Sequence, residues 1–186
     1  MKASCDLALT IRPARPADAL RLQEIEHAAG QRFTEVGLPQ IARMPPRSPD
    51  LLVRAAEAGC LWVAGSDDQL VDFALVERLA DGTAHLEELS VDPAQGRSGI
   101  GTALMRHVER AMAARGHATL TLSTFREVPW NAPWYRRLGY RVLPDADLTP
   151  VLHTLRDEEA ALGLDLSPRF IMRKVFSDAP ENSGIR

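Results

Sequence analysis

Three glycines follow a predicted strand and open a predicted helix, and this arrangement is typical of a phosphate-binding turn. Gly96, Gly99 and Gly101 come soon after Asp92-Pro93, where the strand should end. Glycine lets the chain turn tightly, so that several backbone N–H groups and the positive end of the helix dipole are directed at one point. A pyrophosphate group suits such a site, and Arg97 offers a charged donor for it.

The same turn lacks the features of two common nucleotide-binding motifs. A P-loop has Gly-Lys-Ser/Thr after a four-residue spacer, and no such triplet is present. A dinucleotide fingerprint has a third glycine three residues after its second one, and Leu104 stands at that position. The glycines alone therefore leave two interpretations open, a phosphate site or an ordinary turn before a helix.

A second segment, Asn131-Ala-Pro-Trp-Tyr-Arg-Arg-Leu-Gly-Tyr140, places a helical tyrosine before a Leu-Gly-aromatic turn. Together with Gly99-Ile-Gly101 and the following Ala-Leu-Met, it resembles the two signatures of the GNAT superfamily of acetyltransferases. The opening Ile11-Arg-Pro-Ala is similar to common starts in that family, and the resemblance spans about residues 9–175. Two signatures in the right order, with a helix and a strand between them, are specific for motifs of this kind.

The resemblance implies a role for each matching position. The backbone of Leu89, Ser90 and Val91 would pair with the pantetheine arm of acetyl-CoA, and an N–H there would polarise the thioester carbonyl. Tyr135 would protonate the departing thiolate, and Asn131 would contact CoA through its side chain. The pyrophosphate would be held by the turn residues Gly96, Arg97, Ser98, Gly99, Ile100, Gly101 and Thr102.

Glu88 and Glu87 are the candidates for the base, because an amine must lose a proton before it can attack. Both lie on the strand that leads to the expected thioester site, and neighbours on a regular strand point to opposite faces. A bulge would reverse that parity. We favour Glu88, with Glu87 as the alternative, and either is also consistent with a solvated charge.

Several other residues have two interpretations. Tyr135 is also consistent with a packing aromatic, and His85 is more consistent with a structural role than with a base. Three acidic residues could form an approach for a cationic amine, although a charged helix face usually just faces water. These are Glu24, Glu26 and Glu35.

Composition excludes several classes of function. With a formal net charge of −3, the 186-residue chain has no broad cationic field to attract nucleic acid or anionic lipid. The five histidines lack ligand spacing, so no metal is expected. Cys5 and Cys60 are distant in sequence, which favours reduced thiols and a cytoplasmic protein, although one disulfide is possible. Neither a secretory signal nor an apolar run of membrane-spanning length is expected.

The elements expected from the sequence must position these residues. Leucines and alanines after Pro16 recur at helical spacing up to a stop at Gly30, and residues 31–49 are expected to be irregular. Strands are expected at 61–64, 70–76, 84–91, 118–123, 140–143 and 170–176, with the first two forming a hairpin. Helices are expected at 51–58, where Asp50 would be the cap, after the glycines to Gly116, and at 134–138 and 152–162.

This order of elements predicts an α/β protein with one domain over residues 1–176 and a polar tail at 177–186. By resemblance, the fold would be a mostly antiparallel mixed sheet, splayed around the strands at 84–91 and 118–123 and flanked by helices. The function implied is transfer of an acetyl group from acetyl-CoA to the primary amine of a small molecule or peptide, by direct attack in a ternary complex. A non-catalytic acyl-CoA-binding module is the alternative, a homodimer is possible, and the acceptor cannot be read from the sequence.

Overall fold

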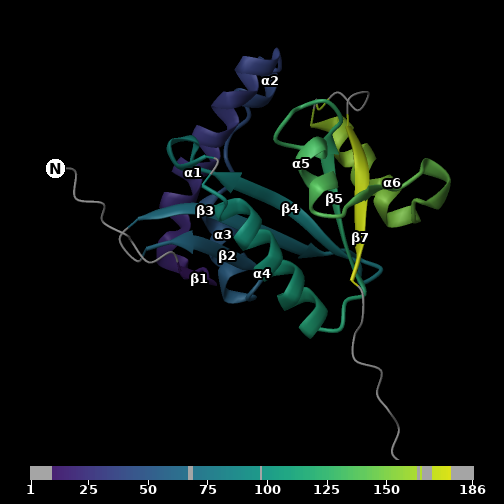
Figure 1. Ribbon diagram of the computed structural model, residues 1–186, viewed down its shortest axis with the longest axis horizontal. Coiled ribbons are helices and arrows are strands. Elements are labelled where there is room, and N and C mark those ends of the chain that lie inside the picture. The colour runs from purple at the N-terminus through teal and green to yellow at the C-terminus, as the bar shows by residue number, and fades with distance from the viewer. Residues whose placement is uncertain (1–9, 67–68, 97, 163, 165–168, 177–186) are drawn as a thin grey trace, which may run out of the picture. The chain divides into compact units, whose positions relative to one another are not determined.

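The computed structural model describes residues 10–66, 69–96, 98–162, 164 and 169–176 (Figure 1). The strands are β1 (Thr10–Pro13), β2 (Leu61–Gly65), β3 (Leu70–Arg78), β4 (Ala84–Val91), β5 (Thr119–Phe125), β6 (Arg141–Val142) and β7 (Arg169–Val175). The α-helices are α1 (Ala19–Gln31), α2 (Pro39–Ala42), α3 (Pro49–Glu57), α4 (Ile100–Ala114), α5 (Ala132–Arg137) and α6 (Pro150–Ala161). Short 3-10 turns lie at Pro16–Asp18, Arg32–Val36, Pro93–Gln95 and Asp145–Asp147.

The seven strands form one sheet in the order β1-β2-β3-β4-β5-β7-β6. Strands β4 and β5 pair in parallel, joined by α4 as a crossover helix, whereas β1–β2, β2–β3, β5–β7 and β6–β7 are antiparallel. A mixed, mostly antiparallel sheet with helices was expected from the sequence, and this prediction is confirmed.

The chain divides into two compact units. Unit 1 comprises Met1–Val76 and Glu88–Val108, and unit 2 comprises Glu77–Glu87 and Glu109–Arg186. The expectation of one domain over residues 1–176 remains a prediction, and the expected tail, residues 177–186, lies outside the described residues.

Unit 1 has a core in which α1 and α3 pack on one face of β2 and β3. Apolar side chains of α1 and α3 pack against alternate side chains of the two strands. The cluster includes Leu22 of α1, Leu52 of α3, Val63 of β2 and Phe73 of β3. Each of these is fully buried, and burial of one such side chain contributes about 1.5–3 kcal/mol. This core fixes the position of α1 against the strands.

Unit 2 places α5 and α6 against opposite faces of β7. Leu152 of α6 packs in a cluster with Ile171 of β7, and Leu143 belongs to the same cluster. On the other face, the ammonium of Lys174 lies 5.7 Å from the ring centroid of Tyr140, just after α5. Alternate residues of a strand point to opposite faces, which accounts for the two layers. Figure 1 shows α5 and α6 on either side of β7.

Some helix boundaries differ from those expected. Helix α1 continues through Gly30, because the packing of its buried leucine and isoleucine outweighs the propensity of one glycine. Ser48, not Asp50, caps α3, since its side chain accepts a hydrogen bond from the Leu51 N–H and Pro49 follows at the first helical position. The segment 31–49, expected to be irregular, contains a 3-10 turn and α2.

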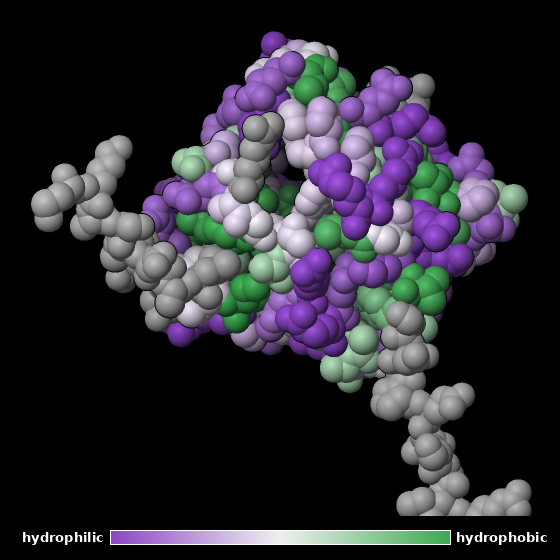
Figure 2. Space-filling view, viewed as in Figure 1, coloured by the Kyte–Doolittle hydropathy of each residue, from purple (hydrophilic) through white to green (hydrophobic). Residues whose placement is uncertain are grey.

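Among the described residues, the large apolar side chains that are exposed are few: Leu20, Val142, Leu162 and Val175. On the face shown in Figure 2, apolar residues form small patches separated by hydrophilic ones. No helix within the described ranges has the length and apolarity needed to cross a membrane.

Candidate functional site

The glycine turn joins β4 to α4 through a short, tightly bonded segment. Asp92 follows β4 and accepts a hydrogen bond from the Ala94 N–H at 3.0 Å, while its own N–H donates to the Val71 carbonyl at 2.7 Å. Gly99 has a φ of +83°, a left-handed conformation that side chains disfavour, and a Cβ there would meet no atom within 4 Å. The turn thus opens directly into α4 on an uncrowded side.

The start of α4 supplies backbone donors. The first bond of the helix runs from the Ala103 N–H to the Gly99 carbonyl, at 3.0 Å. Helix geometry leaves the N–H groups of Ile100, Gly101 and Thr102 without a partner inside the helix, at its positive end. Ser98 is exposed and bonds back to the Gln95 carbonyl, and Arg97 lies outside the described residues. This arrangement suits an anion such as pyrophosphate.

Strand β4 loses its parallel partner before it ends. Its register with β5 runs from Ala84 opposite Leu120 to Leu86 opposite Leu122. The last five residues of β4, Glu87–Val91, have no β5 partner in the described part of the chain. Ser90 is buried, while Leu89 and Val91 are half-buried. An extended ligand could therefore hydrogen-bond to this stretch of backbone as an added strand does.

Glu88 belongs to a polar cluster in unit 1. Its Oε2 lies 2.7 Å from Nη1 of Arg47, and its Oε1 accepts a hydrogen bond of 2.8 Å from the Ser90 hydroxyl. Glu88 and Ser90 are two residues apart on a strand, so they share a face. The same Nη1 also bonds Glu26 of α1 at 2.6 Å.

Glu87 has different surroundings, in unit 2. Burial and then the nearby charges of Glu87 and Glu158 raise the pKa of Glu77 at the end of β3. Glu87 therefore lies near the carboxyl of Glu77, whereas Glu88 bonds a guanidinium. On a regular strand, neighbouring residues such as these two point to opposite faces.

His85 is a structural histidine. It is 2% exposed, and its Nδ1 lies 2.9 Å from the hydroxyl of Thr121, which itself donates to the Ala84 carbonyl. Burial, followed by the charge of Arg169, lowers the pKa of His85 to about 4. The imidazole is therefore neutral at physiological pH and buried in the β4–β5 pair.

Tyr135 lies in an aromatic cluster of unit 2. It is 8% exposed and meets Trp134 and Tyr140 edge-on, with centroid distances of 4.8 and 5.6 Å. The carbonyl of Asn131 accepts hydrogen bonds from the N–H groups of Trp134 and Tyr135, whereas its side chain makes no capping bond. The left-handed Gly139 then turns the chain so that Tyr140 packs beneath the helix.

Behind this cluster is a buried acid. Glu109 of α4 bonds the ammonium of Lys174 at 2.6 Å, and its second oxygen has no described partner. Burial, followed by the charge of Glu109, raises the pKa of Tyr140 well above its usual value, and the charge of Tyr135 adds to this. Tyr140 therefore stays a neutral phenol.

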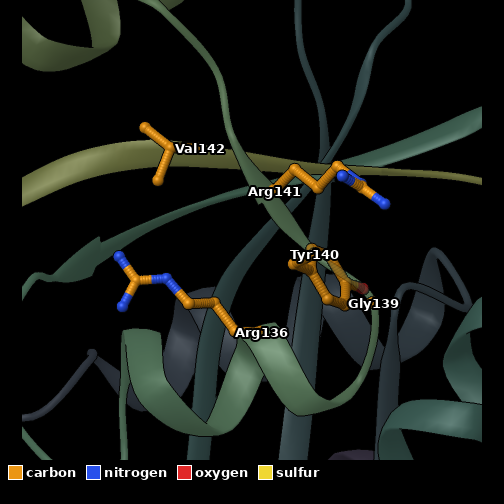
Figure 3. A pocket seen from close by; sticks show the side chains of 5 residues that line it. All are labelled: Arg136, Gly139, Tyr140, Arg141 and Val142. Atoms are coloured by element: carbon orange, nitrogen blue, oxygen red, sulfur yellow. The ribbon is translucent and has the colours of Figure 1, made fainter.

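A surface pocket of about 550 Å³ lies beside the same turn, lined by Arg136, Gly139, Tyr140, Arg141 and Val142. Figure 3 shows the Arg136 and Arg141 side chains extending in opposite directions. No carboxylate or nucleophile is among its lining residues. The pocket is cationic but contains no group suited to proton transfer at neutral pH.

Comparison with known proteins identifies the domain. Residues 57–142 match the acetyltransferase (GNAT) domain family. This segment of the chain is therefore similar to a GNAT acetyltransferase domain. It begins in α3 and ends with β6, so it includes the glycine turn, both glutamates and Tyr135.

Solved structures share the fold of the GNAT domain. PaiA N-acetyltransferase from Thermoplasma acidophilum, in complex with coenzyme A, is 19% identical with a TM-score of 0.67, over 91% of this chain and 100% of that one. The ribosomal-protein-S18-alanine N-acetyltransferase from Escherichia coli is 21% identical with a TM-score of 0.59, over 95% and 99%. N-acetylglutamate synthase from Neisseria gonorrhoeae, complexed with coenzyme A and N-acetyl-glutamate, is 17% identical with a TM-score of 0.69, over 91% of this chain and 35% of that one.

Reasoning from sequence did not find the Arg47 contacts. Arg47 lies in a proline-rich segment without periodicity, and nothing in the sequence indicates that it reaches Glu88. Glu26 was considered only as part of a charged helix face with Glu24 and Glu35. In the structure, Glu26 turns inward to Arg47, whereas Glu35 is exposed and Glu24 pairs with Arg21 at the surface.

Proposed function

We propose that this protein transfers an acetyl group from acetyl-CoA to a primary amine by direct attack of the amine on the thioester. The observation that carries the proposal is the end of β4, where backbone without a β5 partner leads into the Gly99 turn and the first N–H groups of α4. An extended arm followed by a pyrophosphate is the ligand that complements these two features in sequence.

This geometry supports the following binding roles. The backbone of Leu89, Ser90 and Val91 would pair with the pantetheine arm, and the donors of Ile100, Gly101 and Thr102 would hold the pyrophosphate. The rest of that site would be formed by the remaining turn residues, Gly96, Arg97, Ser98 and Gly99, of which Arg97 would add a positive charge. Asn131 would contact CoA through its side chain, which α5 does not use as a cap.

The chemistry requires a base, an oxyanion donor and an acid. Glu88 would take a proton from the ammonium form of the acceptor, and the free amine would attack the thioester carbon. A backbone N–H of β4 would bind the oxyanion as the C–N bond forms. As the C–S bond breaks, Tyr135 would protonate the thiolate, and the second amine proton would leave the nitrogen. The sum is amide, free CoA and one released proton.

Glu87 is the alternative base. Glu87 is one residue from Glu88 on β4, so on a regular strand it points to the other face from Ser90, whose hydroxyl bonds Glu88. We therefore favour Glu88. The same proposal includes three further points. The acceptor is a small-molecule or peptide amine, the protein is cytoplasmic, and a homodimer is possible.

The test is an acceptor screen. Purified protein is incubated with acetyl-CoA and a mixed library of primary amines, and free thiol release is followed, with mass spectrometry of the products. Amine-dependent thiol release together with an acetylated product supports the proposal. If acetyl-CoA binds but no amine causes thiol release, the protein is an acyl-CoA-binding module instead.

A further inference from the structure

Arg47 lies between two carboxylates of unit 1. Its Nη1 is 2.6 Å from Glu26 Oε1 and 2.7 Å from Glu88 Oε2. Its main chain is held by α1 as well, because its N–H donates to Glu26 Oε2 at 3.0 Å and its carbonyl accepts from the Gln23 amide at 2.8 Å. Helix α1 therefore fixes the main chain of Arg47, and the guanidinium extends from there to Glu88 of β4.

The charges of this cluster do not balance. One guanidinium is hydrogen-bonded to two carboxylates. The side chains of Glu26, Arg47 and Glu88 are only 14%, 21% and 24% exposed. Burial and the charge of Glu88 raise the pKa of Glu26, and Arg47 opposes both effects. The two acids thus compete for one neutralising group.

Other charges near α1 are paired among themselves. Arg21 of α1 bonds Glu24 and Asp92, each at 2.9 Å. In the described part of the chain, the contacts of the cluster join Glu26 from α1, Glu88 from β4 and Arg47 from the segment between α2 and α3.

We propose that Arg47 is a positioning residue for the acyl transfer, and that Glu26 and Glu88 take up the proton of the acceptor amine as a coupled pair. This proposal rests on the proposed function. The ammonium of the acceptor gives one proton to the pair and becomes the free amine, so the net charge of the cluster changes from −1 to zero. The proton then passes to solvent before the next turnover.

Arg47 matters because two carboxylates at short range do not both remain ionised without a cation between them. Without the guanidinium, one acid of the pair stays protonated up to a higher pH. While it is protonated, it cannot accept the proton of the amine. The pair then becomes competent only in more alkaline solution. The titration belongs to the pair rather than to one residue.

The first test is the pH dependence of kcat/KM with one amine, which reports groups of the free enzyme. In Arg47→Gln we expect the acidic limb to move up by about one pH unit, with kcat/KM about tenfold lower near pH 7 and recovering above it. Arg47→Lys keeps the charge and should keep the limb near its original pH. The amine's own ionisation is common to all variants and cancels in the comparison.

The double variant separates charge from structure. In Arg47→Gln/Glu26→Gln a single carboxylate remains, so the limb should return toward that of the parent, although Arg47 is still missing. If Arg47 only supports the fold, the second substitution leaves the limb unmoved or lowers activity further, and the proposal is overturned. Glu24→Gln, on the exposed side of α1, is the matched control and should leave the profile unchanged.

Two further measurements keep the proposal testable. If Arg47→Gln does not fold, Glu26→Gln alone should move the acidic limb to lower pH, and an unmoved limb overturns the proposal. Glutamate side chains labelled with ¹³C can also be titrated by NMR without any acceptor. No turnover with any amine refutes the proposed function, whereas a Glu88 carboxyl that titrates identically in the parent protein and in Glu26→Gln refutes the coupled pair.

Discussion

The rings of Tyr135 and Tyr140 meet edge to face, with their centroids 5.6 Å apart and their planes at 69°. Four residues lie between them in the chain, and the left-handed Gly139 makes the approach possible. Edge-on aromatic pairs of this kind are worth about 0.5–1.5 kcal/mol beyond their burial. The contact holds the Tyr135 ring in one orientation while Tyr140 remains a neutral phenol.

Tyr135→Phe should lower kcat about 10²-fold, because the ring and its contacts remain while the acid for the thiolate is lost. The affinity for acetyl-CoA should change little, so the effect appears in kcat rather than in binding. Tyr140→Phe is the matched control, since it removes a buried hydroxyl from the neighbouring ring. Equal rates for the parent and Tyr135→Phe, with chemistry rate-limiting, would assign Tyr135 to packing.

Acetyl-CoA should raise the melting temperature, because it binds the donors at the start of α4 only in the folded state. At a concentration of about 100 times Kd the stabilisation is about 2.7 kcal/mol. Gly101→Glu should abolish this shift, since a carboxylate there repels the pyrophosphate. Gly30→Glu is the control, because a Cβ at that position meets no atom within 4 Å. A shift of equal size in both variants would show that the turn does not bind the pyrophosphate.

Glu88→Gln should reduce kcat/KM most at neutral pH and least at high pH. More of the acceptor is then free amine, so the enzyme's own base matters less. Glu87→Gln should change the rate little, because on a regular strand Glu87 points to the opposite face of β4 from Glu88. The comparison is a pair of pH–rate profiles with the same amine. A silent Glu88→Gln with a defective Glu87→Gln would exchange the two roles.

Asp72→Asn should stabilise the protein above neutral pH. Asp72 is buried in β3, its carboxyl oxygens have no described partner, and burial raises its pKa well above 3.8. The folded state therefore retains a proton that the unfolded chain releases, so stability falls as pH rises from about 4 toward the folded pKa. Asparagine imitates the protonated form and should remove that dependence.

Urea denaturation at pH 5 and pH 8 measures this effect. We expect the variant to be more stable than the parent by about 1–3 kcal/mol at pH 8, and by a smaller amount at pH 5. Glu24→Gln is a control for the loss of one surface charge. A gain of the same size at both pH values would show that Asp72 keeps its ordinary titration.

The sequence predicted well where a local signal was strong. The bounds of β4 agree with those expected, because alternating β-prone residues stand between Asp81-Gly82 and Asp92-Pro93. The glycine turn and α4 were predicted from equally strong local signals. The cap of α3 was assigned to Asp50 because aspartate and serine both cap helices, and only the position of Pro49 favours Ser48.

Long-range contacts were beyond prediction from one sequence. Arg47, Glu26 and Glu88 come from a loop, a helix and a strand, and their meeting depends on how α1 packs on the sheet. Asp72 gave no signal either, since a strand carboxylate is usually at the surface. The roles of the site residues therefore rest on the experiments above.

Both ends of the sheet are poor templates for further strands. At one end β1 finishes with Pro13, which has no N–H to donate, and at the other β6 is two residues long and carries the exposed Arg141. Short edges, proline and charge are means by which proteins avoid edge-to-edge aggregation. A second copy would find little backbone with which to extend the sheet, so any self-association must use side-chain surfaces and should respond to surface mutation rather than to strand-breaking substitutions.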